Sequence, residues 1–150
     1  MSLIGVAALD MLVNIDVPDL EAATAFSVAA FGLAIGRRLG PDAIELLGAP
    51  APLYLLAKPA GTMATASGGQ HRDYRRHWTP VHLDWIVPDL DAALARAVGA
   101  GAVREGGIRT AAWGKIALLA DPYGNGFCLI EFLGRGYDEI AGPAGSASGS

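Results

Sequence analysis

The sequence predicts an α+β protein built from two copies of a βαβββ module, and three observations support this fold class. First, Val17–Ala30 (VPDLEAATAFSVAA) aligns with Val87–Ala100 (VPDLDAALARAVGA) at an offset of 70 residues, with nine of the fourteen positions identical. Second, a run of alternating apolar and polar residues precedes each copy, as in a half-buried strand. Third, shorter strand candidates separated by turn residues follow each copy.

Each module is expected to begin with a strand and then a helix. The runs Met11–Val17 and Val81–Val87 alternate as strands do, and each is followed by a proline, which donates no ladder hydrogen bond. The next residues, Asp19 and Asp89, stand where a helix N-cap belongs, with a further acid in the first turn of each helix. A helix is therefore predicted after each aspartate.

The remaining strands of each module are shorter. In the first module they are expected at Ala34–Leu39, Ala43–Leu47 and Leu53–Lys58. In the second module they are expected at Ala102–Glu105, Trp113–Ala120 and Gly126–Leu133, with a strong turn, DPYGN, between the last two.

The expected domain covers residues 8–135, with a first module at about 8–58, a linker at 59–79 and a second module at about 80–135. A connection as long as 59–79 is usually functional or mobile. Its basic part, His71–His77, has two interpretations: a lid that attracts an anionic or aromatic ligand, or a solvated loop. Residues 136–150 end in a Gly/Ser/Ala-rich stretch and are predicted to form a flexible tail.

Composition excludes several classes of protein. The 150 residues carry 11 basic and 15 acidic side chains, a balance that disfavours a nucleic-acid partner. The single cysteine excludes an internal disulfide and a multi-cysteine zinc site. No apolar stretch is long enough to span a bilayer, and the N-terminus has no signal-peptide pattern. We therefore expect a cytoplasmic protein with no nucleic-acid or membrane partner.

Two βαβββ modules, the segment HLDWIVPDLDAALARAV and the segment DPYGNGFCLIEF together resemble the vicinal oxygen chelate (VOC) superfamily. This superfamily includes glyoxalase I, bleomycin-resistance proteins and extradiol dioxygenases, and the resemblance covers about residues 8–135. It implies two curled sheets that form an eight-stranded cup with the helices outside. It also implies a small-molecule ligand, a homodimer and, in the enzymes, a divalent metal held by the first and last strands of each module.

By this resemblance, His82 and Glu131 occupy the two ligand positions of the second module. Imidazole and carboxylate together suit Zn, Fe, Mn or Ni. Strand parity groups His82 with Asp84, and Glu131 with Leu129, so both groups are expected to line the cup. Cys128 has the other parity and is expected to be a buried, inert thiol under the helix. The pair His82–Glu131 is interpreted as metal ligands, as a general acid/base pair, or as a remnant hydrogen-bonded pair.

The first module offers no matching ligands. The offset of 70 places Leu12 opposite His82, and the end of LYLLA places Leu56 opposite Glu131. Neither leucine binds a metal, so the metal site is incomplete unless another side chain completes it. The candidates are Asp10, Asn14, Tyr54 and Asp84, or His71 or His77 from the linker. The ligand pocket is expected to contain Leu12, Asn14, Tyr54, Leu56, Asp84, Trp113 and Leu129.

Two functions remain from different classes. The first is a glyoxalase- or dioxygenase-like enzyme, in which His82 and Glu131 are catalytic and partly hold a divalent metal. The second is a metal-free protein that binds or sequesters a small molecule, as bleomycin-resistance proteins do. His82 and Glu131 favour the enzyme, and the two leucines favour the binding protein.

Overall fold

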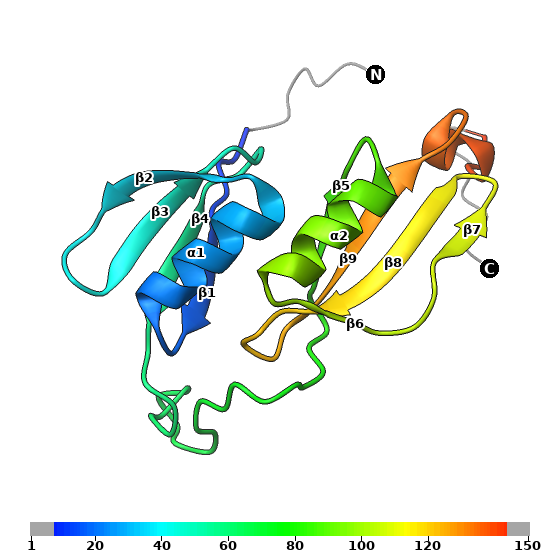
Figure 1. The fold of residues 1–150 in the computed structure, drawn as a ribbon. Helices are drawn as coiled ribbons and strands as arrows, with labels where there is room; N and C mark the ends of the chain where they lie inside the picture. The colour runs from blue at the N-terminus through cyan, green and yellow to red at the C-terminus, as the bar shows by residue number, and fades with distance from the viewer. Residues whose placement is uncertain (1–7, 144–150) are drawn as a thin grey trace. The chain divides into compact units, whose positions relative to one another are not determined.

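The computed structural model describes residues 8–143, and the chain divides into two compact units between Asp73 and Tyr74 (Figure 1). This boundary falls inside the expected linker, so each unit holds one of the two repeated modules. The two units are described separately below.

The first unit contains one helix and one four-stranded sheet. Its elements are β1 (Val13–Val17), α1 (Leu20–Phe31), β2 (Ala34–Arg38), β3 (Ala43–Leu47) and β4 (Leu53–Ala57). The strand order is β1-β4-β3-β2, in which β1 is parallel to β4 and the other pairs are antiparallel. The sheet is therefore mixed and open.

Local sequence signals set the bounds of helix α1. The Asp19 carboxylate accepts a hydrogen bond of 3.0 Å from the Ala22 backbone N–H, as an N-cap does. Gly32 ends the helix at a φ of 66°, a left-handed conformation that favours glycine. The buried side of the helix includes Phe26, while Ile44 of β3 is completely buried in the same unit. Both side chains belong to the apolar core of the unit.

The second unit repeats this topology. Its elements are β5 (Leu83–Ile86), α2 (Leu90–Ala100), β6 (Val103–Arg104), β7 (Arg109–Ala111), β8 (Gly114–Ala120), β9 (Gly126–Phe132) and the 3-10 helix η1 (Gly136–Glu139). The strand order is β5-β9-β8-β6, and β7 also pairs with β8. Strand β5 is parallel to β9, as β1 is to β4 in the first unit. The predicted pair of βαβββ modules and the α+β class are confirmed.

The edge strand of the second sheet is interrupted. Strand β6 pairs with one end of β8, at Leu119–Ala120, and β7 pairs with its other end, at Gly114–Ile116. Gly106, at a φ of 91°, and Gly107 lie between β6 and β7. The expected strand Ala102–Glu105 is thus shorter than predicted, and the chain returns to the same edge as β7.

Helix α2 covers one face of the second sheet (Figure 1). Asp89 caps it, accepting a hydrogen bond of 3.1 Å from the Ala92 backbone N–H. Leu90 and Leu94 are buried on the helix, and Leu119 and Leu129 are buried in the sheet. Burying each leucine side chain contributes on the order of 2 kcal/mol to folding.

Two arginines in the basic part of the linker form ion pairs, each within its own unit. Arg72 Nε lies 2.9 Å from Asp16 Oδ2 within the first unit. Arg76 binds Glu105 in the second unit through two hydrogen bonds of 2.9 and 3.0 Å. Each of these guanidinium groups therefore has a carboxylate partner.

The first residues of the expected tail, Gly136–Glu139, form the 3-10 helix η1. Tyr137 of η1 packs on Trp113 and Phe132, with ring centroids 5.2 and 4.9 Å away. Residues 144–150 of the predicted tail lie outside the described residues. Within residues 8–143, no helix is long and apolar enough to cross a membrane.

Candidate metal and ligand site

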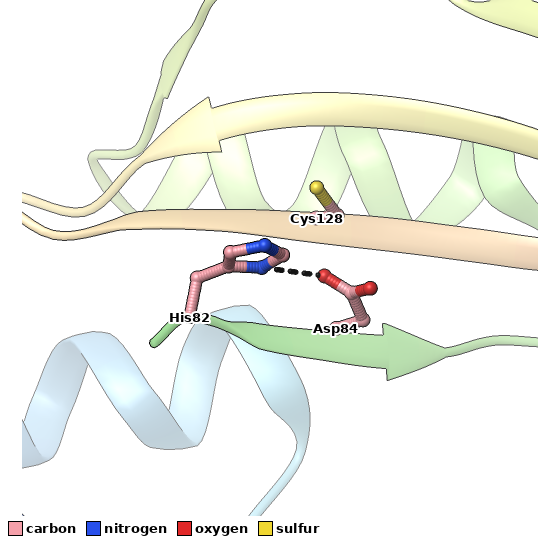
Figure 2. Close-up of side chains that lie close together, drawn as sticks. All are labelled: His82, Asp84 and Cys128. Carbon is pink, nitrogen blue, oxygen red and sulfur yellow. Dashed lines mark hydrogen bonds and ion pairs between the residues drawn. The ribbon is translucent and has the colours of Figure 1, made fainter. Parts of the chain in front are cut away.

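Three metal-binding side chains converge in the second unit: His82, Asp84 and Cys128. His82 lies just before β5, Asp84 is in β5, and Cys128 is the register partner of Asp84 on β9. One donor atom from each side chain lies within 4.8 Å of the other two. His82 Nδ1 and Asp84 Oδ1 form a hydrogen bond of 3.0 Å, which Figure 2 draws as a dashed line in the same view as Cys128. A nitrogen, an oxygen and a sulfur donor therefore lie within 4.8 Å of one another.

The environment of Cys128 keeps its thiol protonated in the absence of a metal. Its residue is 6% exposed, and burial is the main cause that raises the Cys128 pKa to about 11. The negative charge of Asp84 and a hydrogen bond to Asp84 raise it further, while Arg109 lowers it. The thiol alone is therefore a weak nucleophile at neutral pH.

Glu131 does not join His82. Its Oε1 accepts a hydrogen bond of 2.8 Å from the backbone N–H of Leu90, the first residue of α2. Its Oε2 lies 4.0 Å from Lys115 Nζ. The carboxylate accepts a hydrogen bond from a backbone N–H that has no partner within the helix, and its negative charge interacts favourably with the helix dipole. Glu131 therefore stabilises the N-terminus of α2.

The expected arrangement of the β9 side chains is therefore wrong. Asp84 pairs with Cys128, so these two side chains leave the same face of the sheet. Glu131 lies three residues after Cys128 and so leaves the other face, towards α2. Cys128, expected to lie under the helix, is on the face of His82 instead.

A recess of about 340 Å³ lies beside the cluster within the second unit. Cys128 lines one side, and the apolar side chains of Ile116 and Leu118 line another. The interrupted edge strand completes it with Glu105, Gly106, Gly107 and Arg109. The glycines have no side chains to fill this space, so the gap between β6 and β7 forms part of the recess.

The other expected pocket residues of the second unit lie elsewhere. Leu129 is 1% exposed and has the same strand parity as Glu131, on the α2 side of the sheet. Trp113 packs in the aromatic group with Phe132 and Tyr137. The structure thus brings Asp84 to His82, and it brings neither Leu129 nor Trp113 there.

The corresponding face of the first unit carries a different polar group. Asn14 and Tyr54 are register partners on β1 and β4, as Asp84 and Cys128 are on β5 and β9. The Tyr54 hydroxyl donates to Glu45 Oε2 at 2.7 Å, and Arg37 Nη2 lies 2.7 Å from the same oxygen. Hydrogen bonds from Arg37 and then from Tyr54 lower the Glu45 pKa to about 2.

The other expected residues of this unit are aliphatic. Leu12 lies before β1 and is half exposed, and Leu56 is the register partner of Asp16. Neither side chain contributes a metal donor, as expected. The sequence did not predict the polar group of Glu45 and Arg37. The available signal was the single acidic residue in the otherwise apolar strand AIELL, because a buried carboxylate needs a partner.

The donor set of the second unit fits a zinc ion well. Imidazole nitrogen, carboxylate oxygen and thiolate sulfur are all zinc ligands, and three protein ligands leave a position for water or substrate. The side chains of His82 and Asp84 are 52% and 34% exposed, so an ion can reach them from solvent. Binding would displace the thiol proton, because a coordinated thiol is deprotonated.

Comparison with known proteins supports the fold. The protein from Burkholderia phytofirmans PsJN described as a glyoxalase/bleomycin resistance protein/dioxygenase family enzyme is 23% identical, with a TM-score of 0.66 over 81% of this chain and 97% of that one. FosX, a fosfomycin resistance protein from Listeria monocytogenes, is 16% identical, with a TM-score of 0.63 over 85% and 95% of the two chains. Lactoylglutathione lyase from Agrobacterium tumefaciens is 20% identical, with a TM-score of 0.58 over 83% and 94%.

No curated protein sequence matches the chain. The family model described as "Glyoxalase-like domain" matches residues 12–130, which include most of both modules. With the two βαβββ modules and the solved relatives, this match establishes that the chain belongs to the glyoxalase-like domain family of the VOC superfamily.

Proposed function

We propose that the protein binds a small molecule at the second module, beside a divalent metal held by His82, Asp84 and Cys128. The convergence of these three donors within 4.8 Å carries the proposal. His82 remains from the ligand pair expected from the sequence, and Glu131 is replaced by Asp84 and Cys128. The domain assigned to this function is residues 8–135, which includes both modules.

Zinc is the preferred ion of the four named from the sequence, because a thiolate is a soft ligand. When bound, the ion supplies a Lewis acid for an oxygen atom of the ligand. The hydrogen bond of 3.0 Å between Asp84 Oδ1 and His82 Nδ1 orients the imidazole within the cluster. Ile116 and Leu118 supply apolar surface that excludes water beside Cys128.

Metal analysis tests this proposal. Protein purified without chelators is expected to contain about one zinc per chain. Substitution with cobalt should give a thiolate-to-cobalt absorption band that is lost in Cys128→Ser, and His82→Ala should reduce metal content at least tenfold. Glu131→Gln is the matched control and should keep the metal. Equal metal content in all four proteins, or no metal in any, would overturn the proposal.

A second function, metal-free binding of a small molecule, is favoured by one observation. The lining of the recess of about 340 Å³ includes the apolar side chains of Ile116 and Leu118, which can contact an apolar ligand without a metal. This function predicts that metal-free protein binds an apolar ligand with the same affinity as metal-treated protein. A ligand affinity that depends on added zinc would contradict it.

We also propose a cytoplasmic homodimer that binds neither nucleic acid nor membranes. The acidic balance of 15 against 11 charges supports the exclusion of nucleic acid. Light scattering checks the assembly: a dimer has twice the chain mass of 15.4 kDa, and a single chain mass would contradict it.

A further inference from the structure

We propose that Arg109 recognises a negatively charged group of the ligand, so that the recess in the second unit selects small organic anions with an apolar body. This inference rests on the proposed function, because it assigns the ligand to the same recess. Its support comes from three features: the charges around the recess, the position of Arg109, and the size and apolar lining of the space.

Arg109 is the charge in the recess that lacks a counter-ion. The acid of the recess, Glu105, binds Arg76 through two hydrogen bonds of 2.9 and 3.0 Å. Among residues 8–143, Arg109 itself makes no ion pair or side-chain hydrogen bond that would neutralise it. Asp84, the register partner of Cys128, is hydrogen-bonded to His82. A guanidinium without a partner at a concave site is suited to bind a carboxylate or phosphate.

The fold fixes Arg109 beside the recess. It begins β7, and its register partner on β8 is Ile116, which also lines the recess. Regular strand pairing therefore holds the backbone of Arg109 in place. Gly106 and Gly107 precede it and leave the space in front of it without side chains.

The other walls limit what the anion can be. Ile116 and Leu118 offer an apolar surface, which suits a hydrocarbon or aromatic body. The volume of about 340 Å³ lies near the small end of ligand sites in proteins. A compact molecule with one apolar side and one anionic group matches both properties.

Benzoate and its neutral isostere benzamide test the inference. Isothermal titration of the metal-free full chain should show that benzoate binds and that benzamide binds at least tenfold more weakly. Arg109→Gln should weaken benzoate binding at least tenfold, and Arg109→Lys, which keeps the charge but loses the planar fork, should weaken it less. Added salt should also weaken benzoate binding.

Arg96→Gln is the matched control, because Arg96 lies on the exposed side of α2 and its loss changes the net charge by the same amount. It should leave the benzoate affinity unchanged, and circular dichroism should show that every variant is folded. Unchanged affinity in Arg109→Gln overturns the inference. So does equal binding of benzoate and benzamide, or no benzoate binding at millimolar concentration.

A parallel zinc titration separates this inference from the proposed function. If zinc fails to bind while benzoate binding still requires Arg109, the metal proposal is wrong and the inference stands. If zinc binds through the three ligands while Arg109→Gln leaves the benzoate affinity unchanged, the inference is wrong and the metal proposal stands.

Discussion

Asp84 and Cys128 are register partners on the parallel strands β5 and β9, so their side chains leave the same face of the second sheet. This pairing brings a carboxylate to the cysteine and, through His82, an imidazole as well. It also turns Glu131 to the opposite face, towards α2. One register therefore decides which acid lies with the histidine.

The first prediction concerns Glu131 as a support of helix α2. Glu131→Ala removes the carboxylate from the Leu90 N–H, and we expect the free energy of unfolding to fall by about 1–2 kcal/mol. Urea denaturation measures the change. Glu131→Gln keeps an acceptor oxygen and should lose less. A variant that loses metal at unchanged stability would restore the sequence-based assignment of Glu131 as a ligand.

The second prediction concerns the dependence of stability on pH in the first unit. The folded state lowers the Glu45 pKa from 4.5 to about 2, so it binds this proton more weakly than the unfolded state does. The resulting stabilisation is complete above pH 4.5 and is lost as the pH falls towards 2.

Glu45→Gln cannot titrate, so its unfolding free energy should change less across this window than that of the wild type. Urea unfolding at a series of pH values provides the comparison. Parallel pH curves for the two proteins would show that the Arg37 and Tyr54 hydrogen bonds do not stabilise the carboxylate in solution.

The third prediction concerns the reactivity of Cys128. With a pKa of about 11, the thiol of metal-free protein should react with iodoacetamide much more slowly than a free cysteine at pH 8. Asp84→Asn removes a charge that raises this pKa, so it should speed the reaction at the same pH. Mass spectrometry follows the alkylation. A wild-type rate equal to that of free cysteine, or a slower rate in the variant, contradicts the assigned electrostatics.

The fourth prediction concerns Gly124, where the linker contacts the turn between β8 and β9. Gly124 has a φ of 92°, and a Cβ there would collide with the Arg75 carbonyl oxygen and the His77 ring. Gly124→Ala should therefore lower the unfolding free energy by more than about 1 kcal/mol.

Gly99→Ala in α2 is the control, because a Cβ there meets no neighbouring atom. It should be neutral or raise stability by up to about 1 kcal/mol. Thermal unfolding compares the two variants. Equal midpoints would show that the linker does not pack against this turn.

Local signals in the sequence were sufficient for the helix starts and the module pattern. Asp19 and Asp89 cap their helices as predicted, because an N-cap depends only on neighbouring residues. The repeated strand and helix order follows from the same kind of local pattern. The family could therefore be identified from the sequence.

The candidate site depended on relations between strands that the sequence does not contain. Parity shows that Leu129 and Glu131 share a face, but it does not show which face lies under the helix. Leu129 and Ile130 are both 1% exposed, so apolar character marks neither face of β9. The pairing of β5 with β9 places Cys128 on the face of Asp84, and the hydrogen bond from Leu90 to Glu131 places Glu131 on the side of α2.

The recess escaped prediction for a similar reason. Gly106 and Gly107 contribute no chemistry of their own, and their effect appears only when the chain returns to β8 as β7. Arg109 lines the recess only because β7 pairs with β8. An isolated arginine in a short strand gives no such signal in the sequence.

The register pair Asn14–Tyr54 repeats the pair Asp84–Cys128, and the offset of 70 aligns Leu12 with His82. The first module therefore has backbone positions that match those of the three donor residues in the second module. Three exchanges, Leu12→His, Asn14→Asp and Tyr54→Cys, would place the same residue types at the matching positions of the first module. They would add a second candidate site to the one proposed for the second module.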